Sequence, residues 1–501
     1  MKRRSIIIGF LFIILTFGAY LRFEGLNRQS YWMDEGYTVN AVISQISNGT
    51  ERLGSVLDSG NRYFCAIYCA PTAWIVQIFG AHPWSFRVLA GLCGVFVILL
   101  TYAVTKKFFN DQRITMLSTA LVAVSYWQIA WSREARWYTM LELLFWLALF
   151  TYPLTGKKDR PWTHPVRIFF MAIFSAIAIL IHPLAYLLPI ILLAWFWIEH
   201  RPNIKTLTIA TLGVLGFLAF AEFALGVHLF TSSTPVFSLQ NHGIYYVSFY
   251  LRQYWLFIAF AIYGYFVAPQ HDRRRFLLLA LPFFLYLIGL AFFSSTIEYR
   301  YVFHTTLAFF ILGAYGCVRA LEAIKDDFWR IITGLLCVAT LLAEQQIVLN
   351  PLSFYTLEAD DPTTVYGRSY YAYTPQPNFH QAYATIKERI QPDDIVISSH
   401  AHFNKIFLQQ PGYWLGYDYL GRSGVGIPKT QTHEPYVNAS VVHDLDELVA
   451  LMESRHGYIV FDHMSTDRRI RPEIIDYIRT HATLIFDEER NSYSKIWVYR
   501  F

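Results

Sequence analysis

Residues 5–37 read SIIIGFLFIILTFGAYLRFEGLNRQSYWMDEGY. The first part of this stretch, residues 5–21, is apolar and carries no charged side chain. A helix that crosses a membrane needs roughly 20 mainly apolar residues, so this pattern predicts a transmembrane helix. No small-residue cleavage site follows it, which argues against a cleaved signal peptide. The chain then becomes polar and presents the acidic pair Asp34–Glu35 beside aromatic residues.

Similar apolar runs recur along the first two thirds of the 501-residue chain. We expect further spans at residues 85–105, 114–132, 137–155, 166–182, 183–199, 206–229, 250–268, 276–294, 301–320 and 330–349. Residues 64–80 are shorter and contain Pro71, which favours an interfacial or re-entrant segment. Charged residues make up only 15% of the chain, against about 25% in a soluble protein. The sequence therefore predicts a polytopic α-helical membrane protein with about 11 transmembrane helices.

Basic residues indicate the orientation of these helices, because Lys and Arg gather on the cytoplasmic side of a membrane. With the N-terminus inside, 18 of the 27 bases before residue 350 fall on the inner side, including all seven lysines. The outer-side bases are all arginine: Arg22, Arg28, Arg52, Arg62, Arg87, Arg133, Arg136, Arg252 and Arg300. Arginine suits bidentate binding of phosphate, although snorkelling to the interface would explain single cases. We expect a multi-pass protein of the plasma (inner) membrane with a cytoplasmic N-terminus.

The charge balance changes sign near residue 350. Residues 1–349 hold 27 basic and 17 acidic residues, whereas residues 350–501 hold 14 and 19. We therefore divide the chain into a transmembrane domain at 1–349, with a first outer loop at 22–63, a connector at 350–378, and a domain at 379–501. In the last part, helical and strand patterns alternate, which predicts a small α/β domain. An odd number of spans places it outside the cytoplasm. Nothing in the composition suggests a nucleic-acid partner.

The first outer loop carries the strongest candidate for chemistry. Asp34 and Glu35 lie beside Tyr31 and Trp32, just beyond the first span. A carboxylate that is partly desolvated at a membrane surface becomes a better general base near neutral pH. An ordinary acidic pair, or a helix N-cap at Asp34, would give the same pattern.

Other polar clusters fall at outer span ends. Arg133 and Arg136 flank Glu134 and precede Tyr138; their spacing suits one helical face, so they form either an anion site or a capping ion pair. Further clusters are Arg300–Tyr301, His182 in a tight hairpin turn, and Arg62 at the end of the first loop. His182 fits a hydrogen-bonded turn residue as well as a ligand. Together these groups would suit a lipid whose phosphate lies at the surface and whose tail lies in the bilayer.

Several motifs resemble those of GT-C glycosyltransferases, which include the protein O-mannosyltransferases (glycosyltransferase family 39) and the lipid A aminoarabinose transferases. The matching residues are Arg22, Gly25-Leu26, Ser30-Tyr31-Trp32, Asp34-Glu35, Phe79-Gly80, Phe86-Arg87, Ala135-Arg136-Trp137-Tyr138 and Tyr299-Arg300-Tyr301. The resemblance covers about residues 5–349. One departure is the sequence Asn61-Arg62-Tyr63-Phe64, where many relatives carry a basic residue followed by a Pro pair.

The resemblance implies a single-sugar transfer, usually with inversion, from a polyprenyl-phosphate sugar to an acceptor on the outer face. Asp34 would be the general base, and Glu35 would position the acceptor or the loop. Arg136 and Arg300 would hold the lipid phosphate, with Arg62 as a further candidate, and the substrate-binding set would also include Tyr138, His182 and Tyr301. No dedicated metal-ligand set is evident, so we predict independence of metal, although some relatives bind a divalent cation. The acceptor could be a protein, a lipid or a glycan.

Two other functions fit the composition. A secondary transporter or flippase for a lipid-linked or anionic substrate would usually show repeats and charges near the bilayer midplane. This sequence shows no repeat, and most of its outer-side charges lie at span ends. A non-catalytic membrane anchor would leave the outer arginines and the Asp34–Glu35 pair unexplained.

Overall fold

The computed structural model describes residues 2–48, 62–152, 165–223, 243–293, 299–344, 346–350, 377–416, 430–434, 437–468, 470–488 and 495–501. Most of the predicted connector at 350–378 and part of the first outer loop lie outside these residues. Among the described residues, helices predominate up to residue 343, and a mixed helix and strand region follows from residue 379.

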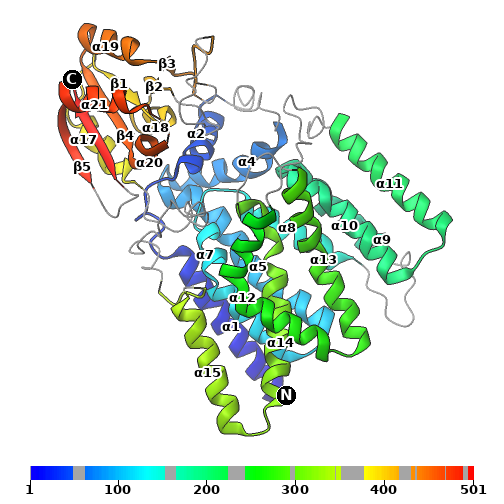
Figure 1. The fold of residues 1–501 in the computed structure, drawn as a ribbon. Helices are drawn as coiled ribbons and strands as arrows, with labels where there is room; N and C mark the ends of the chain where they lie inside the picture. The colour runs from blue at the N-terminus through cyan, green and yellow to red at the C-terminus, as the bar shows by residue number, and fades with distance from the viewer. Residues whose placement is uncertain are drawn as a thin grey trace.

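The helical body is a bundle of long apolar helices (Figure 1). Its α-helices are α1 (Lys2–Phe23), α2 (Met33–Asn48), α4 (Arg62–Phe79), α5 (Pro83–Phe109), α6 (Gln112–Val124), α7 (Tyr126–Ser132), α8 (Tyr138–Thr151), α9 (Pro165–Ile181), α10 (Leu187–His200), α11 (Ile204–Phe223), α12 (Gly243–Val267), α13 (Gln270–Phe293), α14 (Leu307–Ala323) and α15 (Asp327–Ala343). Two 3₁₀ turns, η3 (Pro183–Tyr186) and η4 (Tyr299–Thr305), precede α10 and α14.

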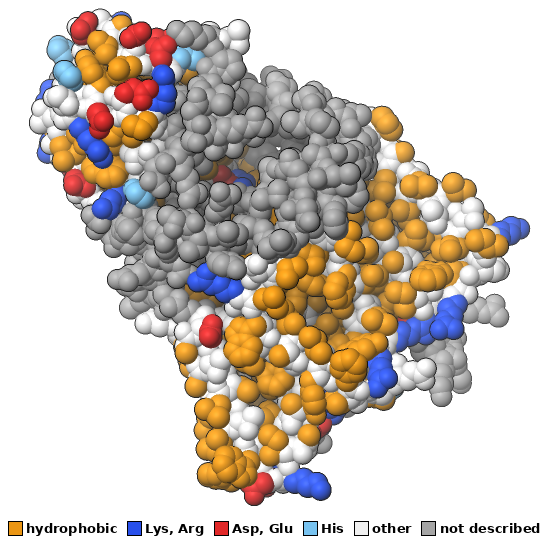
Figure 2. Space-filling view, in the orientation of Figure 1, with side chains coloured by type: hydrophobic (Ala, Val, Ile, Leu, Met, Phe, Trp, Pro, Cys, Tyr) orange, Lys and Arg blue, Asp and Glu red, His pale blue; other side chains and the backbone are white. Residues whose placement is uncertain are grey.

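Apolar side chains cover much of the outside of this body (Figure 2). Among the described residues, two helices are long and apolar enough to cross a membrane by themselves, at Ser5–Phe23 and Pro83–Phe109, and six more apolar helices are shorter. Large apolar side chains such as Phe12, Ile209 and Leu335 are exposed on the surface of the body and would contact water if no bilayer covered them. A bilayer would cover such a surface. The number of membrane crossings stays a prediction.

Several predicted spans are not single α-helices; the span at 183–199, for example, begins as the 3₁₀ turn η3. The span at 114–132 is interrupted at Ser125, where the backbone is extended and pairs with residues after α15. The Tyr126 amide donates to the Gln346 carbonyl at 3.1 Å, and the Val348 amide donates to the Val124 carbonyl at 2.8 Å. The span at 301–320 begins as the 3₁₀ turn η4 and becomes α-helical only at Leu307. These last two irregular segments adjoin the outer-side residues described below.

Helix α2 lies in the predicted first outer loop and α4 follows that loop. The two helices pack on each other near one end of the body. Helix α2 occupies a stretch that the sequence indicated only as loop, and α4 occupies the apolar segment with Pro71. Figure 1 shows α4 running across the ends of the long helices rather than along them. The interfacial or re-entrant location expected for residues 64–80 fits this direction and stays a prediction.

Residues 379–501 form a six-stranded sheet with helices. Its strands are β1 (Ile395–Ser398), β2 (Tyr413–Leu415), β3 (Ser440–Val442), β4 (Gly457–Asp462), β5 (Thr483–Glu488) and β6 (Ile496–Arg500). The spatial order is β3-β2-β1-β4-β6-β5, parallel from β3 to β4 and antiparallel at β6 and β5. The helices are α17 (Phe379–Lys387), α18 (Ala401–Leu408), α19 (Leu445–Ser454), α20 (His463–Arg468) and α21 (Pro472–His481).

This sheet region lies against α2. Tyr31, Val39 and Val42 from the first outer loop share a buried cluster with Phe379 and Phe403 of the sheet region. Figure 1 shows α2 between the sheet and the helical body, and the N-terminus at the far end of that body. The sheet region therefore packs on the same loop that carries Asp34 and Glu35.

Candidate active site

Helix α2 places Asp34 and Glu35 in its first turn. The helix begins at Met33, and its first backbone hydrogen bond runs from the Gly36 amide to the Trp32 carbonyl. Trp32 is therefore the N-cap residue and Glu35 the third helical residue. The Glu35 carboxylate accepts a hydrogen bond from the Trp32 amide at 3.1 Å, as the third residue of a capping box does. The capping role considered for Asp34 thus falls to Glu35, which leaves the Asp34 side chain to point elsewhere.

Glu35 is closed within a buried clamp with Arg87 of α5. The Arg87 guanidinium donates two hydrogen bonds to the Glu35 carboxylate, at 2.8 and 2.7 Å. The same guanidinium also donates to the backbone carbonyls of Leu26, Gln29 and Ser30. Because neither side chain has meaningful exposure, this clamp fixes the path of the first outer loop against α5.

A third element joins this clamp from the turn between α7 and α8. The Ala135 amide donates to Glu35 at 2.6 Å, and Glu134 forms a side-chain hydrogen bond with Glu35. Burial and the Glu35 charge raise the pKa of Glu134 well above its ordinary value. Burial acts in the same direction on Glu35, but the charge and hydrogen bonds of Arg87 outweigh it and lower the pKa of Glu35. We conclude that Glu134 is the protonated partner and Glu35 the ionised one.

Asp34 faces the other way, toward Arg136 and Arg300. The Arg300 guanidinium donates a hydrogen bond to the Asp34 carboxylate, and an Arg136 nitrogen lies 3.6 Å from the same oxygen. Arg136 also donates to the Asp34 carbonyl at 2.9 Å and to the Thr38 hydroxyl at 3.1 Å. Residues that are about 100 and 266 positions apart in sequence thus meet at one carboxylate. We call these three residues the outer ion cluster.

Aromatic rings surround the outer ion cluster. The Arg136 guanidinium lies 3.5 Å above the Trp137 ring, and that of Arg300 lies 5.5 Å from the Trp32 ring. Such cation–π contacts fix a guanidinium while leaving its N–H groups available to an anion. The remaining rings of the site are those of Tyr138, His182 and Tyr301, with the His182 ring centroid 6.1 Å from Tyr138 and 6.0 Å from Tyr301. Figure 2 shows a hollow near the sheet region with acidic and basic side chains at its base.

The structure brings together seven of the eight residues that the sequence proposed for the site. His182 is also the expected turn residue, because its Nδ1 accepts from the Leu184 amide at 3.2 Å. Arg62 is the first residue of α4, but its side chain lies outside the described part of the chain. In the described ranges, no group of three or more His, Cys, Asp or Glu side chains is arranged to hold a metal ion.

Sequence reasoning missed the roles of three further residues. Arg87 entered only as one of the outer-side arginines and as part of a motif, yet its buried guanidinium organises the loop. Trp137 and Thr38 were not singled out. The Trp137 ring packs under the Arg136 guanidinium, and the Thr38 hydroxyl accepts a hydrogen bond from it. The signal for Arg87 was present, because an arginine inside an apolar span requires a buried anionic partner.

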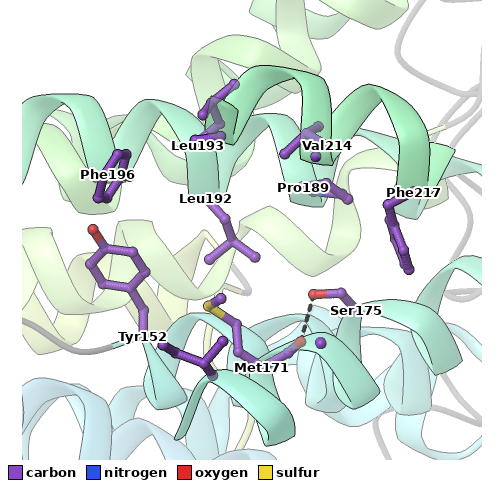
Figure 3. Close-up of a pocket in the computed structure, with 13 residues that line it drawn as sticks. Tyr152, Met171, Ser175, Pro189, Leu192, Leu193, Phe196, Val214 and Phe217 are labelled. Atoms are coloured by element: carbon purple, nitrogen blue, oxygen red, sulfur yellow. Dashed lines mark hydrogen bonds between the residues drawn. The ribbon is translucent and has the colours of Figure 1, made fainter. Parts of the chain in front are cut away.

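An apolar cavity of about 360 Å³ lies between α9, α10 and α11. Tyr152, Met171, Leu192, Phe196 and Phe217 are among its lining residues (Figure 3). Helices α9 and α10 are joined by the turn at His182 and Pro183. The cavity therefore lies along the same hairpin whose outer turn contributes His182 to the site.

Comparison with known proteins assigns the architecture. The sequence model of the dolichyl-phosphate-mannose-protein mannosyltransferase family matches residues 71–225. ArnT from Cupriavidus metallidurans, in the apo state, superposes with a TM-score of 0.62 over 100% of this chain and 98% of its own, at 11% identity. The chain has the GT-C glycosyltransferase fold.

Other solved structures share this GT-C fold. The same ArnT bound to undecaprenyl phosphate gives a TM-score of 0.59 at 12% identity, with 98% of both chains covered. The oligosaccharyltransferase AglB from Archaeoglobus fulgidus, in complex with an inhibitory peptide and a dolichol-phosphate, gives 0.53 at 13% identity over 93% of this chain and 70% of its own. No curated protein matches the chain significantly by sequence.

Proposed function

We propose that this GT-C protein is a membrane glycosyltransferase that moves one sugar from a polyprenyl-phosphate-linked donor to an acceptor hydroxyl on the outer face of the membrane. One observation carries the proposal: the Asp34 carboxylate lies between two guanidinium groups, Arg136 and Arg300, in a ring of aromatic side chains. A base beside two phosphate-binding groups is what transfer from a sugar phosphate requires. The matched mannosyltransferase family and the lipid phosphates bound by the two neighbours support it.

The reaction is a single displacement in this proposal. Asp34 accepts the proton of the acceptor hydroxyl, and the acceptor oxygen forms a bond to the anomeric carbon of the sugar. The bond from that carbon to the phosphate oxygen breaks, and its electron pair leaves with the polyprenyl phosphate. Attack from the face opposite the leaving group inverts the anomeric centre. Arg136 and Arg300 stabilise the negative charge that develops on the leaving phosphate.

Donor binding would rearrange the outer ion cluster. Arg300 now donates to Asp34, but a phosphate offers several oxygens in the geometry that a guanidinium prefers. When the phosphate engages Arg136 and Arg300, the Asp34 oxygens are left to accept the acceptor proton. The donor thus prepares its own base, which couples donor binding to deprotonation of the acceptor.

The remaining site residues have supporting roles in the proposal. Glu35 positions the loop through Arg87, and Tyr138, Tyr301 and His182 line the place of the sugar and phosphate. The apolar cavity between α9 and α10 offers a place for part of the polyprenyl tail, because those helices descend from the turn at His182. We propose metal-independent chemistry, with Arg136 and Arg300 neutralising the phosphate. The acceptor, whether protein, lipid or glycan, reaches Asp34 from the outer side.

The direct test is transfer in reconstituted vesicles. Purified full-length protein is mixed with polyprenyl-phosphate sugars of several types, and mass spectrometry follows the release of free polyprenyl phosphate and the mass added to an acceptor extract. Lipid that co-purifies with the protein is identified in the same way. We expect a polyprenyl phosphate to co-purify and one donor to be consumed, in chelator as well as in buffer with a divalent cation.

A complementary assay addresses the transporter alternative. Vesicles loaded with a labelled lipid-linked sugar on one leaflet report its movement to the other leaflet. Movement without any consumption of donor would contradict the glycosyltransferase proposal. Loss of transfer in chelator, restored by a divalent cation, would contradict metal independence alone.

A further inference from the structure

Two helices of the sheet region contact the first outer loop on both sides of Asp34–Glu35. Helix α17 contacts the residues just before the pair, and α18 contacts the residues just after it. The outer ion cluster lies on the remaining side of the pair. The catalytic turn of α2 is therefore held between the helical body and the sheet region.

The contact with α18 is close enough to exclude a side chain at position 36. A Cβ atom on Gly36 would lie 2.4 Å from Cδ2 of His402 and 2.8 Å from Cε1 of Phe403. The His402 ring also packs on the Tyr37 ring, with 4.3 Å between ring centroids. Gly36 is two residues after Asp34, so α18 packs directly against the first turn of α2.

The contact with α17 centres on His380. Its Nδ1 lies 3.2 Å from the Ser30 hydroxyl, and its backbone amide donates to the same hydroxyl at 3.3 Å. The His380 ring packs on the Tyr31 ring at 5.2 Å. Since the Ser30 carbonyl also accepts a hydrogen bond from Arg87, this contact connects α17 to the buried clamp.

The ring of His402 is enclosed at this interface. The residue is 1% exposed, and its Nε2 has no hydrogen-bond partner in the described part of the chain. Burial lowers the pKa of His402 well below its usual range. The imidazole is therefore neutral and serves as a packing surface for Gly36 and Tyr37.

We propose that the sheet region is a positioning device for the catalytic carboxylate, with His402 and His380 as its positioning residues. This inference rests on the proposed function, since it assigns these residues to the placement of Asp34 as the base. A base must lie within hydrogen-bond reach of the proton it takes, and a displacement near 1 Å can cost about 10²-fold in rate. Contacts that hold both ends of the α2 first turn keep Asp34 at its reacting position.

The test uses a matched pair of histidine variants in the full-length protein. His402→Ala removes the ring against α2, and His481→Ala removes an equivalent ring that packs on Tyr477, 4.0 Å between centroids, in α21. His481 is exposed, and its ring and its Nδ1 both contact Tyr477 within the same helix. Hydrogen exchange is measured over residues 33–42, and donor turnover is measured as kcat and KM.

We expect His402→Ala to speed exchange over residues 33–42 and to lower kcat about tenfold with little change in the donor KM. His481→Ala should change neither. Gly36→Ala should lower kcat further, and Gly36→Ala combined with His402→Ala should recover part of it. This recovery distinguishes positioning from general destabilisation.

Two outcomes separate the inference from the proposed function. Unchanged exchange and unchanged kcat in His402→Ala, with a fully active natural protein, would overturn the inference and leave the function standing. Absence of sugar transfer in the natural protein would overturn the function. Faster exchange in His402→Ala would then still support the mechanical link between the sheet region and α2.

Discussion

Two adjacent carboxylates of the first outer loop each form a group with arginines from other elements, and the two groups differ in what surrounds them. The clamp of Glu35 and Arg87 is sealed, with side-chain exposures of 0% and 2%. In the outer ion cluster, Asp34 and Arg300 retain 13% and 16%. Every oxygen of Glu35 is engaged by fixed donors, whereas Asp34 is engaged mainly by side chains that an anion could recruit. In the proposed function, two carboxylates that are adjacent in sequence therefore have different roles, Glu35 a structural one and Asp34 a chemical one.

The largest effect is expected from a change at Asp34, the carboxylate to which we assign the chemistry. Asp34→Asn keeps the shape of the side chain but removes its ability to take a proton. We expect transfer to fall about 10²–10⁴-fold, while donor affinity and thermal unfolding in detergent stay close to those of the natural protein. Full transfer activity in this variant would rule out Asp34 as the base.

The next largest effect is expected on stability, from a change at Glu35 in the buried clamp. Glu35→Ala leaves the buried Arg87 guanidinium without its anion, so we expect destabilisation by about 3–5 kcal/mol, seen as a lower unfolding temperature. The control is Glu24→Ala, because Glu24 is partly exposed and its partner Arg28 is 55% exposed, so this ion pair should contribute about 1 kcal/mol or less. Equal unfolding temperatures for the two variants would argue against a structural clamp.

A third prediction sharpens the role of the two arginines. Arg136→Ala and Arg300→Ala should each weaken binding of the polyprenyl-phosphate donor about 10- to 100-fold, the loss expected for one charge-assisted hydrogen bond. Arg300→Lys should be intermediate because the planar fork is lost. Arg28→Ala, an exposed outer arginine, serves as the control. Donor affinity is measured by titration with native mass spectrometry or fluorescence. Unchanged affinity in both alanine variants would contradict the phosphate site.

The smallest effect concerns pH and the proton on Glu134. Its pKa is raised in the folded protein, so the unfolded chain ionises this group first. The associated stability is complete below the unfolded pKa of about 4.3 and is lost as pH rises through the folded pKa. Glu134→Gln stays neutral at every pH, so its unfolding temperature should fall less than that of the natural protein between pH 6 and pH 9. Parallel declines would contradict a proton shared with Glu35.

Much of the helical body follows from the sequence alone. Apolar runs predicted the long helices. An apolar residue such as Leu15 or Ile98 is stable in a bilayer or in a packed bundle, so this prediction needs no knowledge of its distant contacts. After residue 379 the structure contains both helices and strands, as the alternating patterns indicated. Short elements such as β2, β3 and α18 were missed, because three to eight residues carry too little periodicity to be recognised.

The sequence also supplied the residue types of the site. Outer-side charges restricted to arginine, and the Asp34–Glu35 pair beside aromatic residues, indicated a lipid-phosphate chemistry before any contact was known. This was possible because charges are costly near a membrane and are kept mainly where they act.

Only the tertiary structure decided which carboxylate does what. Asp34 and Glu35 are neighbours in one helical turn, and local sequence cannot tell which faces Arg87 and which faces Arg300, since those arginines come from α5 and η4. The same holds for the packing of His402 on Gly36, which joins residues over 360 positions apart. Long-range contacts of this kind depend on how whole elements pack. The sequence predicted a chemistry, and the packing of distant elements determined which residues meet at the proposed site.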